Sequence, residues 1–349
     1  MRSTSSAARS HSRSWGPTLL AATGTSLDAV ELWPIALAGF LARGGIVLFL
    51  LPIVVIPTPS GIADVIAPAI ISFYFGLVSP AFIAIVVTLA VSIVAAIVLG
   101  GLAGGWADVE LIRAIAGSSG ADGGAQVSHA VVSRAFAVRF LAHLPLWIAL
   151  AWGAVRIVEA TYTELVTPFE VVTPLALRVL AAVPDAVAVV LGTWILGEAA
   201  GGLGVRRLVL GHAGVARASI GGWVDLARHP VSSATTIVVA DVIVAVAVLP
   251  GLLASSVAWS WVRTAILGGS GLIQAGGALV LLVAVWLAGL LLASVATAWR
   301  SAAWTAEATR GDLRRREAGR PSEAAAGTFG DGAHRRPGDW SSSDSSGRL

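Results

Sequence analysis

The sequence has no cysteine and no lysine, so all 23 of its lysine-plus-arginine residues are arginines. Without cysteine the chain has no disulfide, no thiolate nucleophile and no cysteine-bound zinc or iron–sulfur cluster. Without lysine it cannot form a Schiff base or complete the phosphate-binding loop of nucleotide hydrolases. It also lacks a His-Glu-x-x-His metal motif, an acidic metal cluster and a dinucleotide-binding glycine pattern. We therefore expect no catalytic residues, no cofactor and no metal ion, and a protein that is not an enzyme.

Charged residues are scarce, at 12% of 349 residues against 56% hydrophobic residues. A typical globular domain carries about a quarter charged residues, and the mean hydropathy here is +0.83. This composition predicts an all-α, polytopic membrane protein. The isoelectric point near 10.4 would suit a nucleic-acid partner. The net charge is only +3, however, and the arginines lie between apolar runs, so we expect no nucleic-acid binding.

Six segments are candidates for transmembrane helices, each of which needs about 20 mostly apolar residues. They are residues 35–56, 81–102, 138–158, 184–204, 230–253 and 273–297. Arginines gather before the first segment, between the second and third, between the fourth and fifth, and after the sixth. With six crossings, all of these positions fall on one side of the membrane. Because short cytoplasmic loops are enriched in arginine, we expect both termini to lie in the cytoplasm.

The two ends of the chain differ in composition from the middle. Residues 1–26 are rich in arginine and serine, and their apolar patch is too short for a signal peptide. Residues 305–349 are rich in glycine, serine, arginine and aspartate, a mixture that buries too little apolar surface to fold. We expect a disordered cytoplasmic leader over 1–26, a transmembrane domain over 27–304 and a disordered cytoplasmic tail over 305–349.

A short string recurs at the start of each odd-numbered span. Its three copies are Leu41-Ala42-Arg43, Leu141-Ala142-His143 and Leu226-Ala227-Arg228. The pattern favours three hairpin repeats, at about 27–104, 129–204 and 213–300, arranged like the parallel repeats of some transporters. The alternative is chance, because leucine and alanine are abundant here and orientation already requires a cation before these spans.

An amphipathic segment precedes each copy of the string, at residues 27–41, 129–141 and 213–226. Apolar residues with arginines and tryptophans are typical of helices that lie among the lipid headgroups. We therefore expect three cytoplasmic interfacial helices. Their expected anchors are Arg43, His143, Arg228, Trp33 and Trp223.

The fourth span is followed by Arg206-Arg207-Leu208-Val209-Leu210-Gly211-His212-Ala213-Gly214-Val215, an amphipathic piece and another span. This arrangement, over roughly residues 190–250, resembles a pattern in uncharacterised bacterial multi-pass membrane proteins. It is also similar to the membrane domain attached to some glycerophosphoryl diester phosphodiesterases. The sequence contains no phosphodiesterase domain, so the resemblance implies a membrane architecture and not that activity. It also implies that the protein lies in a bacterial inner membrane.

Ionisable residues inside spans are the default functional candidates in a membrane protein. Arg156 and Asp241 each lie eleven residues after the proline that follows their copy of the string, so equivalent helices would bring them to one depth. Glu159 shares a helix face with Arg156, and Asp185 begins the fourth span. We expect these four residues to form an intramembrane polar site. They would be a structural ion pair with its neighbours or the wall of a polar cavity.

Two functions remain open. The first is a non-catalytic scaffold or accessory protein, whose arginines bind anionic lipid at the cytoplasmic face or whose surface binds partner proteins. The alternative is a transporter or channel with an outward-facing polar cavity near Arg156 and Asp241. The first predicts a dry bundle with its charges paired, whereas the second predicts a hydrated path past Asp241.

Overall fold

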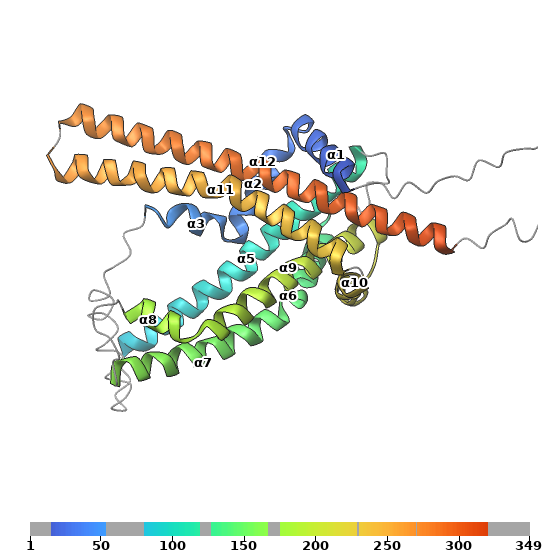
Figure 1. Ribbon diagram of the computed structural model, residues 1–349, viewed down its shortest axis with the longest axis horizontal. Helices are drawn as coiled ribbons and strands as arrows, with labels where there is room; N and C mark the ends of the chain where they lie inside the picture. The colour runs from blue at the N-terminus through green and yellow to red at the C-terminus, as the bar shows by residue number, and fades with distance from the viewer. Residues whose placement is uncertain are drawn as a thin grey trace, which may run out of the picture. The chain divides into compact units, whose positions relative to one another are not determined.

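The computed structural model describes residues 15–53, 80–118, 127–166, 175–228, 230–269 and 271–319. All regular elements in these ranges are helices, which confirms the expected all-α class (Figure 1). Six helical segments are long and apolar enough to cross a membrane, as expected. They are Leu32–Leu50, Phe82–Ser118, Leu144–Glu164, Pro184–Leu210, Val238–Leu267 and Leu272–Thr309.

The first candidate span is bent. It consists of α2 (Leu32–Phe40), a π-helical turn η1 (Leu41–Gly45) and α3 (Ile46–Leu50). Gly44 has φ 99° inside the turn, a conformation that L side chains rarely adopt. The glycine therefore permits the bend, and the bend redirects the side chain of the preceding Arg43.

The next spans are α5 (Pro80–Ser118), α7 (Leu144–Val166) and α9 (Pro184–Gly211), with the short helix α8 (Leu175–Ala182) between the last two. Proline stands at the first position of α9, where its missing N–H costs no intrahelical hydrogen bond. Along α5, large apolar side chains such as Val91 and Leu99 are 62% and 67% exposed. These are the side chains that lipid tails would cover.

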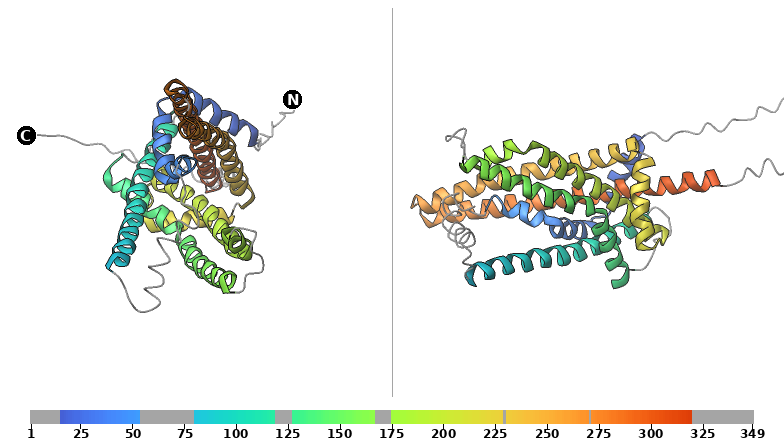
Figure 2. Two further views of the ribbon diagram at one scale, coloured as in Figure 1. Left: turned by 90° about the vertical axis from the view of Figure 1, so that its left-hand side faces the viewer. Right: turned by 90° about the horizontal axis from the view of Figure 1, so that it is seen from below.

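The last two spans are α11 (Pro230–Leu267) and α12 (Leu272–Gly319), which run side by side (Figures 1 and 2). A Cβ placed on Gly251 would meet the Cα of Gly289, and one placed on Gly289 would meet the Phe49 ring. Small residues allow membrane helices to approach this closely. The compact unit that contains these contacts ends at Ala308.

Two short helices, α6 (His129–Ala142) and α10 (Val215–Arg228), pack against α9. The Ser128 side chain caps α6 by accepting a hydrogen bond from the Val131 N–H. Arg207 of α9 holds α10 through two hydrogen bonds to Asp225, at 2.5 and 2.7 Å. The expectation of helices over 129–141 and 213–226 is thus confirmed.

The prediction of a single interfacial helix over residues 27–41 is wrong. The chain breaks between α1 (Trp15–Asp28) and α2, and α2 belongs to the first candidate span. It packs along α5, where Gly39 is close enough for an added Cβ to meet Ala107. Packing against α5 therefore places α2 within the helix bundle and not among the lipid headgroups.

Helices extend closer to both ends of the chain than expected. Residues 15–26 belong to α1, whose Thr23 hydroxyl accepts a hydrogen bond from the Trp299 indole at 3.0 Å. At the other end α12 continues to Gly319, and Thr305 is buried beside Arg206. The helical residues 15–26 and 305–319 lie within the chain ends that were expected to be disordered. Residues 1–14 and 320–349 lie outside the described residues, and the division of the chain into leader, domain and tail stays a prediction.

Each copy of the recurring string stands at a change of helix. Arg43 (φ −90°, ψ 19°) and His143 (φ −92°, ψ 7°) share nearly the same non-helical backbone conformation. Arg228 ends α10 just before α11 begins at Pro230. The string therefore marks a break between two helices in all three places, and the threefold repeat itself stays a prediction.

Candidate functional site

A network of buried charges joins helices that are far apart in the sequence. Arg43 of η1 pairs with Asp108 of α5 and also donates to the Gly104 carbonyl at 3.0 Å. Arg139 of α6 pairs with the second oxygen of Asp108, with 2.6 Å between Nε and Oδ2. Asp108 is therefore held between two guanidinium groups.

Arg139 also reaches α9, because its NH1 lies 2.9 Å from Oε2 of Glu198. Only 10 to 13% of the side chains of Asp108, Arg139 and Glu198 is exposed. Burial alone would lower the pKa of Arg139, but the two carboxylates raise it above its usual value. Arg139 therefore stays charged and bridges α5 to α9.

Arg300 of α12 extends the network to the last hairpin. Its guanidinium lies 3.7 Å from Oε1 of Glu198 and 3.1 Å from Oδ1 of Asp241 on α11. The ion-pair network, as we name it, thus consists of Arg43, Asp108, Arg139, Glu198, Asp241 and Arg300. It connects η1, α5, α6, α9, α11 and α12.

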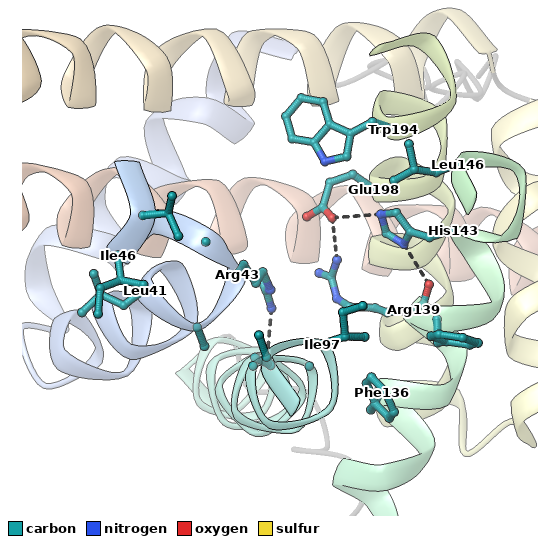
Figure 3. Close-up of a pocket in the computed structure, with 18 of the residues that line it drawn as sticks. Leu41, Arg43, Ile46, Ile97, Phe136, Arg139, His143, Leu146, Trp194 and Glu198 are labelled. Carbon is teal, nitrogen blue, oxygen red and sulfur yellow. Dashed lines mark hydrogen bonds and ion pairs between the residues drawn. The ribbon is translucent and has the colours of Figure 1, made fainter. Parts of the chain in front are cut away.

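A pocket of about 450 Å³ opens beside this network, between η1, α3, α5, α6, α7 and α9 (Figure 3). Its wall is apolar and includes Ile46, Ile97 and Trp194. All three of these wall residues belong to candidate membrane spans. The pocket therefore opens among segments that lipid would surround.

The floor of the pocket is charged, with Arg139, His143 and Glu198 pointing toward one another and Arg43 turned toward α5 (Figure 3). Nδ1 of His143 donates to the Arg139 carbonyl oxygen at 2.8 Å, a tautomer assigned from the hydrogen-bond partner. Its Nε2 lies 3.8 Å from Oε2 of Glu198. The Nε of Arg43 is buried and has no hydrogen-bond partner, so the floor keeps an unused donor.

The expected pair between Arg156 and Asp241 is wrong. Arg156 lies 3.2 Å from Asp185 and 3.4 Å from Glu159, while Asp241 pairs with Arg300. Arg156, Glu159 and Asp185 come together as expected, but all three side chains are more than a third exposed. Equal spacing from the recurring string predicts that two residues lie at the same depth along their helices. It does not predict which helices are in contact.

Two of the expected anchors turn into the bundle instead of lying at its surface. Arg43 contacts Asp108, and His143 lies near Glu198. Arg228 is exposed, and Trp223 is half-buried on α10. Trp33 is also partly buried, and its indole donates to the Ser26 carbonyl at 2.9 Å.

Sequence reasoning missed Asp108, Arg139, Glu198 and Arg300 as site residues. A usable signal exists for Arg300, because it and Asp241 lie at nearly equal distances along their helices from the turn between α11 and α12. For Arg43 no such signal exists, because only the bend at Gly44 brings its side chain to α5.

The fold and the apolar surfaces define the class: the chain is an integral, multi-pass membrane protein. Within the described ranges no group of three or more histidine, aspartate or glutamate side chains is placed to hold a metal ion. No protein-family model, curated protein or solved structure matches the chain.

Proposed function

We propose that this chain is a non-catalytic membrane scaffold or accessory protein that binds an anionic lipid in the pocket beside the ion-pair network. The observation that carries the proposal is the two-part lining of that pocket. Its apolar wall suits acyl chain, and its floor presents two guanidinium groups against one carboxylate. An anionic phospholipid combines these two chemistries in one molecule.

The pairing of the buried charges favours a scaffold role over a role as a transporter or channel. Asp108, Glu198 and Asp241 each have an arginine within 4 Å, which offsets their desolvation in the membrane. The cavity at the centre of the network measures only about 10 Å³, room for about one water molecule. These features favour a closed bundle, whereas a transporter or channel needs a continuous hydrated path.

The arginine bias further supports an orientation in which the network lies toward the cytoplasmic face of a bacterial inner membrane. Arginines near that surface gain about 1 kcal/mol each from its anionic lipids. A scaffold role would use this attraction to hold the pocket at the level of the headgroups.

Lipid retention tests the proposal directly. The protein is placed in nanodiscs of phosphatidylcholine with phosphatidylglycerol and then extracted in mild detergent. Native mass spectrometry identifies the lipids that stay bound to it. We expect the wild type to retain phosphatidylglycerol in preference to phosphatidylcholine. Ala96→Trp should abolish this preference, because Ala96 lines the pocket and an indole there would fill it.

The matched control is Ala95→Trp on the same helix, an exposed position that does not line the pocket. It should retain the lipid like the wild type. Equal retention of both lipids by the wild type, or equal losses in the two variants, would overturn the proposal.

A further inference from the structure

Arg206 is a buried cation without a carboxylate partner among the described residues. It lies on α9 and is only 4% exposed. Its guanidinium donates to the carbonyls of Gly202 and Ser301, at 2.9 and 3.1 Å, and to the Thr305 hydroxyl at 3.2 Å. It also lies 5.3 Å from the centre of the Trp304 ring. Each of its three nitrogens thus has a neutral acceptor. Asp108 is the carboxylate that interacts with its charge, and Asp108 is already paired with Arg43 and Arg139.

The buried cluster as a whole has an excess of positive charge. Four arginines, Arg43, Arg139, Arg206 and Arg300, face three carboxylates, Asp108, Glu198 and Asp241. One positive charge is left over in a low-dielectric region, where an uncompensated charge is costly. A single monovalent anion would cancel it.

The structure holds a cavity where such an anion would fit. All four arginines line it, together with only one carboxylate, Asp108. Asp108 is itself paired with two of these arginines. The volume of about 10 Å³ is close to the smallest that holds one water molecule, so the cavity suits a single monatomic anion better than a phosphate or carboxylate group.

Unused hydrogen-bond donors surround the same cavity. The indole N–H of Trp304 and the hydroxyl of Thr297 are buried without partners, and these residues are 4% and 3% exposed. Nε of Arg43 is a third unpartnered donor. Buried polar groups are normally paired, so three orphaned donors beside one small cavity indicate a missing acceptor.

We propose that this cavity binds one small monatomic anion of the halide class, with chloride as its ordinary occupant. A trapped water molecule would accept hydrogen bonds but would leave the extra positive charge in place. A metal cation is excluded by the four arginines. Arg43 and Arg139 line both this cavity and the larger pocket, whereas Arg206, Thr297 and Trp304 line the small cavity alone. The anion site is therefore distinguished from the proposed lipid site by these last three residues.

The test is halide-dependent stability of the purified full chain in detergent. Thermal unfolding is followed while sodium chloride replaces sodium gluconate at constant ionic strength. We expect the unfolding midpoint to rise and saturate with chloride, because gluconate is too large to enter. Midpoints that do not change as chloride replaces gluconate would overturn the proposal.

Substitutions in the cavity wall test whether the chloride dependence of stability arises at this site. Trp304→Phe keeps the ring and removes the N–H, and Thr297→Val removes the hydroxyl. Each should weaken apparent chloride affinity about tenfold, the equivalent of one charge-assisted hydrogen bond. Arg206→Gln should abolish the chloride dependence. If Arg206→Gln does not fold, the other two variants carry the test.

The matched controls are Trp299→Phe, whose indole binds Thr23, and Arg207→Gln, whose side chain pairs with Asp225. Both should keep the wild-type chloride affinity even where they lower stability. Chloride affinity that is unchanged in Trp304→Phe and Thr297→Val, or that falls equally in the controls, would contradict the proposed site.

Discussion

Arg139 of α6 donates a hydrogen bond to Glu198 of α9 across 2.9 Å, and this contact forms part of the floor of the pocket. Arg139 precedes the third candidate span, whereas Glu198 lies within the fourth. The pair therefore ties a short helix outside the spans to a helix that crosses the membrane. Removing either partner would leave the other as a buried charge with less compensation.

The pair between Arg300 and Asp241 should appear as an energetic coupling. Asp241→Asn and Arg300→Gln should each destabilise the protein, and the double variant should lose less than their sum. We expect a coupling of about 0.5 to 3 kcal/mol, the range for residues in contact. The side chain of Asp241 is 33% exposed, which favours the lower half of that range. Chemical unfolding in detergent measures all three variants.

A second cycle, with Asp241→Asn and Arg156→Gln, serves as the control. Because Arg156 pairs with Asp185 and Glu159 instead, these two effects should add within about 0.5 kcal/mol. Strong coupling of Asp241 to Arg156 and none to Arg300 would contradict the observed pairing.

Gly44→Ala should destabilise the bend of the first span. The φ of 99° places an added Cβ in a conformation that costs an L residue about 1 to 2 kcal/mol. Gly192→Ala on α9 is the matched substitution, since it has ordinary helical geometry and no atom within 4 Å of the added Cβ. It should stabilise the protein by about 0.5 to 1 kcal/mol. Equal effects of the two variants in thermal unfolding would show that the bend carries no strain.

The orientation can be measured with single cysteines, because the natural sequence has none. Ser118→Cys lies at the end of α5, and Gly271→Cys lies between α11 and α12. A maleimide that cannot cross membranes should label Gly271→Cys in intact cells and Ser118→Cys only after permeabilisation. The reverse pattern would show that the arginine-rich loops face outward.

The spans were predictable because helices such as Phe82–Ser118 contain an apolar run that is long enough to identify a crossing from composition alone. The helix ends were less predictable. Residues 305–319 look polar enough for a disordered tail, yet their alanines, arginines and glutamates are good helix formers. Those residues simply continue α12.

The partners within the site were the least predictable feature. Sequence spacing places Arg156 and Asp241 at similar positions along their helices, but contact also depends on which faces meet. Asp241 meets Arg300 because the hairpin of α11 and α12 returns the chain past it. Arg43 looks like an ordinary cation at the start of a span, and only the π-helical turn directs it to Asp108.

The central claim is that the buried charges form one structural network, and a double-mutant cycle between Arg139→Gln and Glu198→Gln in lipid nanodiscs tests it most directly. Each single variant should lower the free energy of unfolding by about 3 to 5 kcal/mol, the range for breaking a buried ion pair. The double variant should recover part of that loss, giving a coupling of about 1 to 3 kcal/mol. Additive effects of the two substitutions would contradict the account, because they would mean that the two side chains do not stabilise each other.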